Sequence, residues 1–142
     1  MQFRPAAFLI GLVAAMGFLS AQTPTKIKSV PLTPTSPASG QEMFATYCAV
    51  CHGPDGKGNG PATPALKTPP ANLARLAASH DGIFPENRVF GILSGKVEIT
   101  AHGSSEMPMW GTLLRSLSPG DSKMANLRVV NLTSYLKSIQ EK

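Results

Sequence analysis

The chain has 142 residues, which is enough for one ordinary domain, and 42% of them are hydrophobic. Its 13 glycines and 13 prolines favour a domain with long irregular loops over a regular bundle or sheet. The formal charge of +5 overstates the basicity of that domain, because from Ser39 onward ten basic residues stand against eight acidic ones. Since no basic stripe interleaved with aromatic residues remains, the sequence argues against nucleic-acid binding.

Residues 1–21 have the pattern of an export signal. Arg4 supplies a positive charge, Ala6–Leu19 is an almost unbroken apolar run, and Ser20 and Ala21 are small residues suited to cleavage. The alternative is a retained N-terminal anchor, since a leucine at the third position before the cut is imperfect for cleavage. In either case we expect the domain to be periplasmic, either free or anchored to the inner membrane.

Residues 22–38 are rich in threonine, serine and proline, which predicts a semi-extended linker before a domain at residues 39–142. Ser39 and Glu42 have the spacing of a capping box, and this predicts a helix from there to about Cys51. The apolar residues of this helix recur at spacings of three and four: Met43, Phe44, Tyr47 and Val50.

The two cysteines of the chain, Cys48 and Cys51, lie three residues apart, and His52 follows at once. A disulfide between them would close too small a loop to restrict the unfolded chain. A redox dithiol would normally follow a strand, and a structural zinc site would need a fourth ligand. The sequence CAVCH instead matches a site for covalent attachment of c-type haem, because positions i, i+3 and i+4 share one face of a helix. We therefore expect thioethers from both cysteines and iron ligation by His52.

Two shorter helices are predicted in the middle of the domain. They span Ala71–Ala78 and Pro85–Leu93, and the second has proline in its first turn. Val97–Thr100 alternates like a strand, but one such run has no partner to pair with. We therefore expect it to be an extended loop.

A long helix is predicted at the C-terminal end. Ser118 and Asp121 have the spacing of a second capping box, with proline at the first helical position, and the apolar periodicity continues to about residue 139. We expect an aromatic contact between Phe44 and Tyr135 to join this helix to the first one.

Together these features make residues 39–142 similar to the class I c-type cytochromes, which are small exported electron carriers with one haem. Besides the CAVCH pentapeptide, the matching residues are Gly40, Phe44, Pro64, Leu132 and Tyr135. The resemblance implies a mainly α cytochrome c fold, with about four short helices wrapped around one covalently bound haem and with long irregular loops. It also implies that the carbonyl of Pro64 accepts a hydrogen bond from the imidazole of His52.

A low-spin electron carrier needs a second axial ligand, and the resemblance implies a methionine in a Met-Pro step. Met107 is followed by proline in an irregular loop, so we expect it to bind the iron opposite His52. Met109 stands two residues further on and is an alternative. A histidine ligand, either His102 or less favourably His80, would give a haem of lower potential, because methionine ligation raises the potential of cytochromes c.

Four further side chains are candidate partners for the haem propionates: Trp110 through its indole N–H, and Lys67, Arg75 and Arg115 through their charges. For Trp110 a buried packing role is an equal alternative. For the three cations the alternative is a solvated surface position, which is the commoner environment of such side chains.

The resemblance implies an electron-transfer protein and not an enzyme, namely a periplasmic single-electron carrier with haem c and His/Met ligation. The expected donor is a dehydrogenase or a quinol-oxidising complex, and the expected acceptor is an oxidase. Two alternatives stay open. One is a haem c subunit or anchored electron-transfer module of a larger oxidoreductase, and the other is a haem enzyme or gas sensor with an open sixth position.

Overall fold

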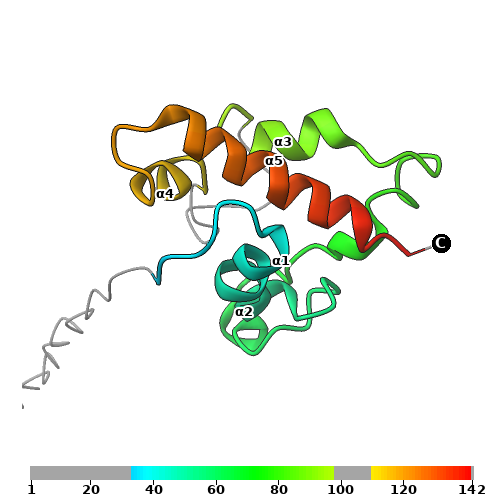
Figure 1. The fold of residues 1–142 in the computed structure, drawn as a ribbon. Coiled ribbons are helices and arrows are strands. Elements are labelled where there is room, and N and C mark those ends of the chain that lie inside the picture. The colour runs from blue at the N-terminus through cyan, green and yellow to red at the C-terminus, as the bar shows by residue number, and fades with distance from the viewer. Residues whose placement is uncertain (1–32, 98–109, 142) are drawn as a thin grey trace, which may run out of the picture. The chain divides into compact units, whose positions relative to one another are not determined.

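Residues 33–97 and 110–141 are described by the computed structural model, and they contain helices, turns and loops but no strand. In chain order the elements are α1 (Gly40–Met43), the π-helical turn η1 (Phe44–Cys48), α2 (Ala49–His52), the 3₁₀ turns η2 (Thr63–Ala65) and η3 (Leu73–Arg75), α3 (Glu86–Leu93), α4 (Trp110–Ser116) and α5 (Ser122–Ser138). The mainly α architecture predicted from the sequence is confirmed (Figure 1). The expected export signal lies outside the described residues.

The first helical stretch begins where the sequence predicts. Ser39 Oγ accepts a hydrogen bond of 3.1 Å from the backbone N–H of Glu42 and so caps α1. The other half of the predicted capping box differs, because the Glu42 carboxylate accepts from the N–H of Ser36 at 3.1 Å. The stretch continues through η1 and α2 and ends at His52, one residue beyond the predicted end.

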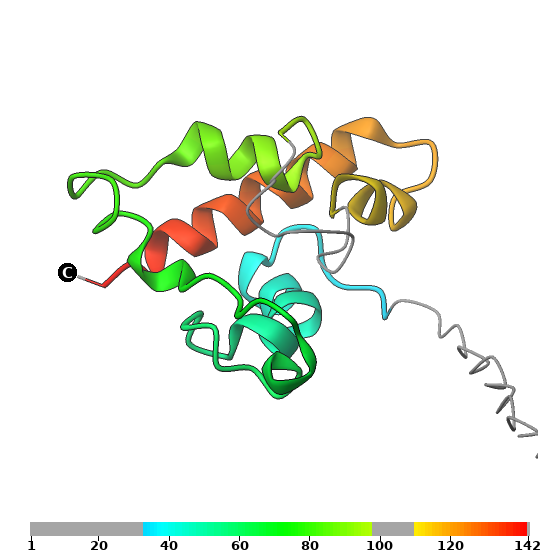
Figure 2. The ribbon, with the colours of Figure 1, turned by 180° about the vertical axis from the view of Figure 1, so that it is seen from behind.

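The helix α1 crosses α5 at a point where only glycine fits. A Cβ on Gly40 would overlap the carbonyl oxygen of Asn131 and would lie 2.7 Å from Cβ of Tyr135. One turn further on, the ring centroids of Phe44 and Tyr135 are 5.3 Å apart, which confirms the predicted aromatic contact. Leu132 of α5 is completely buried. Two segments far apart in the sequence therefore meet in one close-packed contact. Figures 1 and 2 show α1 beside α5 from both sides.

The terminal helix α5 starts later than predicted. Its N-cap is Asp121, whose Oδ1 accepts from the N–H of Met124 at 2.9 Å, so the predicted capping role of Ser118 is wrong. Pro119 is not helical here, because the chain turns between Ser118 and Asp121, with Gly120 at a φ of +75° and a 3.1 Å bond from the N–H of Asp121 to the Ser118 carbonyl. The helix ends at Ser138, close to the predicted end.

The segment predicted as a helix at Ala71–Ala78 is not an α-helix. It contains the single 3₁₀ turn η3, which the Asn72 side chain caps by accepting from the N–H of Ala74 at 3.0 Å. The backbone does make one α-type bond there, because the N–H of Ser79 donates to the Arg75 carbonyl at 3.1 Å, and Ser79 Oγ donates to the same oxygen at 3.1 Å. The segment therefore forms separate turns, and no continuous helical run follows η3.

The second middle helix is confirmed to within one residue, since α3 begins at Glu86 with Pro85 at its N-cap position. At its end the chain folds back, and the N–H of Val97 donates to the Gly91 carbonyl at 3.1 Å. The rest of the predicted extended loop lies outside the described residues.

The helix α4 was not predicted from the sequence. The signal was present, because apolar residues recur there at helical spacing: Trp110, Leu113, Leu114 and Leu117. Leu114 is 1% exposed and belongs to the hydrophobic core together with residues of α1, α3 and α5. The helix therefore closes one side of that core.

Residues 33–38, the end of the Pro- and Thr-rich segment, are bonded to the helices. Arg128 of α5 is only 5% exposed, and its Nη1 donates to the Thr35 carbonyl at 2.8 Å. Asn131 Nδ2 donates to the Pro37 carbonyl at 2.8 Å, and the Tyr47 hydroxyl contacts Thr35 Oγ1 at 3.0 Å. This short segment thus packs as part of the domain.

Candidate haem-binding site

A cavity of about 220 Å³ lies among the first helical stretch, the segment 71–80, α3, α4 and α5. Its wall is mainly made of leucine, valine, isoleucine, phenylalanine and proline side chains. The wall residues with ionisable or polar groups are Cys48, His52, His80, Arg88 and Trp110. An apolar cavity with a few convergent polar groups is the usual form of a cofactor site.

The predicted attachment residues lie on the first helical stretch, which borders this cavity. Cys48 is 8% exposed, Cys51 is half-buried, and both thiols are free of disulfides. Cys48 and His52 line the cavity, whereas Cys51 lies on the same helical stretch outside the lining. The wide turn η1 ends at Cys48, where the N–H of Ala49 bonds to the carbonyl of Phe44, five residues back. π-Helical turns of this kind occur frequently at functional sites.

Burial raises the pKa of the Cys48 thiol to about 12, and the neighbouring Cys51 adds to the effect. The Cys48 side chain therefore stays a neutral thiol at physiological pH in the chain without haem. A neutral thiol is a weak nucleophile and exchanges disulfides slowly.

The imidazole of His52 is held in a defined orientation. The side chain is 8% exposed, and Nδ1 lies 3.0 Å from the carbonyl oxygen of Ala71. Because a carbonyl can only accept, Nδ1 carries the proton and donates it, which makes Nε2 the nitrogen suited to bind a metal. Metal-bound histidines almost always have such a partner on their other nitrogen.

The expected partner of this imidazole was wrong. The sequence analysis assigned the accepting carbonyl to Pro64, and the structure has Ala71 in that role. Pro64 lies in η2, and this turn is bonded to the end of the first helical stretch, because Thr63 Oγ1 donates to the carbonyl of Cys51 at 3.0 Å. Asn72 is the N-cap of η3, so the carbonyl of the residue before it, Ala71, lies outside the turn. This carbonyl is therefore available to accept the hydrogen bond from His52.

The glycine-rich loop after His52 folds back over the end of α2. The N–H of Gly58 donates to the carbonyl of His52 at 2.7 Å, and the N–H of Gly60 donates to that of Cys51 at 3.1 Å. A Cβ on Gly60 would lie 2.5 to 2.6 Å from the carbonyl oxygens of Val50 and Ala49. The loop therefore satisfies the last helical carbonyls at the place where the two cysteines and the histidine stand.

The predicted propionate partners are only partly near the cavity. Trp110 lines it, is 8% exposed and packs with its ring centroid 6.0 Å from that of Tyr47, while donation of its indole N–H to a propionate stays a prediction. Arg75 approaches Glu141 at 3.8 Å, and neither it nor Lys67 nor Arg115 lines the cavity.

The cavity-lining arginine is Arg88, which the sequence analysis missed. Its signal is the spacing of Pro85, Arg88, Val89 and Ile92, which places it on the cavity face of α3.

The expected sixth ligand, Met107, and its alternatives Met109 and His102 lie outside the described residues. The remaining alternative, His80, lines the cavity, and its Nδ1 is 2.8 Å from the carbonyl of Leu76. The identity of the sixth ligand stays a prediction.

Two further observations apply to the described part of the chain, residues 33–97 and 110–141. No three histidine, cysteine, aspartate or glutamate side chains there come together as a site for a metal ion. No helix there is long and apolar enough to cross a membrane.

The sequence model of the family described as Cytochrome c matches residues 37–140, which is well over half of the chain. The chain therefore belongs to the cytochrome c family, whose members bind haem c covalently and transfer electrons. No curated protein and no solved structure matches it. The residues present fit the cofactor, since an oriented imidazole and a buried thiol border an apolar cavity.

Proposed function

We propose that this protein is a periplasmic single-electron carrier whose haem is attached through Cys48 and Cys51 and ligated by His52 and Met107. The observation that carries the proposal is the imidazole of His52 in the wall of an apolar cavity, with its Nδ1 bonded to the Ala71 carbonyl. This arrangement holds the ring in one tautomer and one orientation, as a metal ligand requires.

The haem supplies the one-electron chemistry of its iron, and the chain supplies burial and orientation. Leu132 and Leu93 of the cavity wall are 0% and 5% exposed, so this wall excludes water from one side of the cofactor. A low-dielectric surrounding and a methionine ligand both raise the reduction potential. The fixed imidazole limits movement of the ligand between the two oxidation states.

The periplasmic location follows from the export signal expected at residues 1–21. We propose a dehydrogenase or quinol-oxidising complex as the donor and an oxidase as the acceptor. With ten basic against eight acidic residues from Ser39 onward, long-range electrostatic steering is weak. We also propose that the contacts with these partners are small and transient, as is usual for electron transfer.

The testing experiment is a pair of spectra on protein matured in a host that attaches haem c. The alkaline pyridine haemochrome should have the spectrum of a haem with two thioether bonds. Acid acetone should not extract this haem from the protein. The oxidised protein should show the charge-transfer band of methionine bound to iron. Met107→Ala should abolish that band, whereas Met109→Ala and His102→Ala should keep it. Loss of the band in Met109→Ala alone would move the sixth ligand to that residue.

Carbon monoxide separates the carrier from an enzyme or sensor. A ferrous iron with both axial positions filled should bind carbon monoxide slowly and weakly. Immediate and strong binding by the unmutated protein would show an open sixth position and would contradict the carrier.

A further inference from the structure

The position of the Ala71 carbonyl depends on the short segment that follows it. Two prolines precede Ala71, so the backbone has no N–H donors at positions 69 and 70. On the other side, the N–H of Leu73 donates to the Gly56 carbonyl at 2.7 Å and Asn72 caps η3. The hydrogen bond to His52 is therefore made by a turn that has no helix or strand ladder of its own.

The two residues after α5 and its C-cap, Gln140 and Glu141, bind this turn, and we name them the C-terminal latch. Gln140 Nε2 donates to the Leu73 carbonyl at 2.8 Å, and its Oε1 accepts from the N–H of Ala77 at 2.8 Å. The N–H of Glu141 donates to the Ala74 carbonyl at 2.7 Å. These contacts join positions more than 60 residues apart and lie on both sides of η3.

The amide of Gln140 is itself fixed. Its Nε2 also donates to the carbonyl of Leu136 in the last turn of α5 at 2.7 Å, and the side chain is half-buried. A side chain anchored to its own helix holds the turn more rigidly than a free one, because less rotamer freedom remains to be lost. The amide therefore couples the position of α5 to that of η3.

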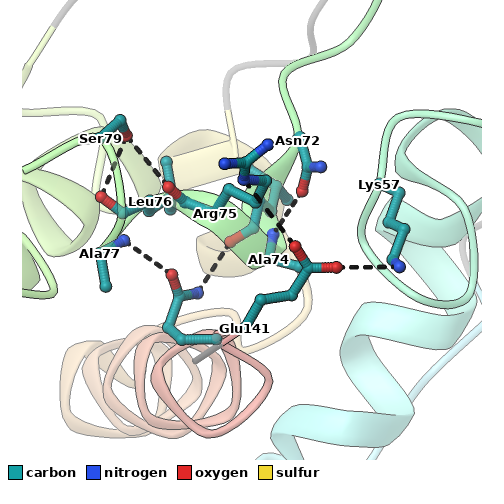
Figure 3. Close-up of polar contacts among 10 residues, drawn as sticks. Lys57, Asn72, Ala74, Arg75, Leu76, Ala77, Ser79 and Glu141 are labelled. Atoms are coloured by element: carbon teal, nitrogen blue, oxygen red, sulfur yellow. Dashed lines mark hydrogen bonds and ion pairs between the residues drawn. The ribbon is translucent and has the colours of Figure 1, made fainter. Parts of the chain in front are cut away.

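The charged part of the latch is weaker. The Glu141 carboxylate lies 2.8 Å from Lys57 Nζ and 3.8 Å from Arg75 Nε, and Figure 3 shows it between these two side chains. The Lys57 and Glu141 side chains are 48% and 39% exposed, and such surface pairs contribute little. The amide and backbone bonds are therefore the main part of the latch.

We propose that Gln140 is a positioning residue for the haem ligand His52. It acts through Leu73 and Ala77, which hold the turn whose Ala71 carbonyl accepts the hydrogen bond from Nδ1–H. A shorter and better-aligned bond makes the imidazole more basic and favours ferric over ferrous iron. The proposal rests on the proposed function, since it requires His52 to ligate the iron.

The test uses the full-length, haem-loaded protein. Gln140→Met keeps the length of the side chain and its neutrality but removes both of its hydrogen bonds to the turn. Gln140→Asn keeps the amide but is one methylene too short, and it serves as a second variant. The two measurements are the midpoint potential and the exchange rate of the His52 ring N–H with solvent by NMR.

Two control variants separate positioning from general loosening. Val129→Ala removes core volume on α5 at a residue that does not line the cavity. Ser138→Ala removes a 2.7 Å bond from Ser138 Oγ to the Tyr135 carbonyl in the same last turn, and within the described residues Ser138 has no hydrogen bond to the η3 turn. Both changes are neutral in charge, as are the Gln140 variants.

We expect Gln140→Met to raise the midpoint potential. At a fixed solution potential, the ratio of reduced to oxidised protein should increase about threefold, which is the scale of one weakened hydrogen bond. The ring N–H should exchange about tenfold faster, because opening of the turn limits the exchange. Gln140→Asn should shift both values in the same direction. The two controls should change neither value, although Val129→Ala should lower the melting temperature.

The proposal is overturned if Gln140→Met lowers the melting temperature and leaves the potential and the ring N–H unchanged. It is also overturned if Val129→Ala shifts the potential as much as Gln140→Met. Loss of the proposed function has a different signature: the unmutated protein would then lack the low-spin His/Met spectrum. If every variant keeps that spectrum and all have the same midpoint potential, the proposed role of Gln140 is wrong and the proposed function stands.

Discussion

The crossing of α1 with α5 and the turn around η3 are held in different ways. At the crossing, Gly40 allows the backbone of α1 to come close to the Asn131 carbonyl of α5, and Leu132 is fully buried. At the turn, the chain is held by polar contacts from Asn72 and Gln140. The comparison shows that the close-packed contact is sensitive to side-chain volume, whereas the hydrogen-bonded turn is sensitive to the presence and position of donors and acceptors.

The largest effect is expected from Leu132→Ala. Removing a fully buried leucine at the crossing should lower the free energy of unfolding by about 3 kcal/mol. Leu127→Ala on the same helix is the control, because Leu127 is 41% exposed and its loss should cost about 0.5 kcal/mol. Urea unfolding of the haem-loaded proteins measures both. Equal losses would show that the crossing is not the tightly packed region.

A smaller but opposite change of volume is Gly40→Ala. The new Cβ would overlap the Asn131 carbonyl oxygen, so α1 must shift away from α5 at a cost of about 2 kcal/mol. Gln41→Ala, at the exposed neighbouring position, should be nearly neutral. If Gly40→Ala were as stable as the unmutated protein in urea, the helices would not cross as closely as described.

At the turn, Asn72→Ala should lower the free energy of unfolding by about 1 kcal/mol, because the cap on the N–H of Ala74 is lost. Asn72→Asp keeps the accepting oxygen and should recover most of this loss. Thermal unfolding of the three proteins gives the comparison. A loss that aspartate does not recover would mean that the asparagine acts through some contact other than the cap.

The smallest effect should come from the exposed pair of Lys57 and Glu141. The hydrogen bond and charge of Lys57 lower the pKa of Glu141 below its usual 4.5, so this contribution is present above pH 4.5 and is lost as the pH falls through the folded-state pKa. The pKa of Lys57 is raised above 10.5 by Glu141, so its contribution is present below pH 10.5 and is lost at higher pH.

Melting temperatures of the unmutated protein and of Glu141→Gln, measured across pH and at low and high salt, test this contribution. The two curves should converge at both extremes of pH and at high salt. A gap that persists at high salt would mean that Glu141 stabilises the protein through its neutral contacts.

The parts of the fold that were predicted correctly depend on short-range spacing. Gly40 and Phe44 stand one turn apart, Ser39 precedes Glu42 by a capping distance, and Pro85 precedes α3. Each of these signals lies within a few residues of the structure it predicts. The predicted contact of Phe44 with Tyr135 was confirmed because the family resemblance supplied the long-range part.

Two wrong predictions depend instead on contacts between residues that are far apart in the sequence. The carbonyl that accepts from His52 was assigned to Pro64, and the turn at Ala71 is stabilised by Gln140, far away in the sequence. No local pattern contains that pairing. The same reason explains the wrong helix at Ala71–Ala78: the N–H of Ala77 and the carbonyl of Leu73, which would bond to each other in an α-helix, both bond to the side chain of Gln140.

The bond from buried Arg128 to Thr35 sets a limit on how far the domain can move if the N-terminal segment is retained in a membrane. With residues 33–38 bonded to the helices, the sequence leaves eleven residues, 22–32, between the predicted N-terminal anchor (residues 1–21) and the part of the domain that the structure describes. Fully extended, eleven residues reach at most about 40 Å. An anchored form would then deliver electrons only to acceptors standing close above the same bilayer.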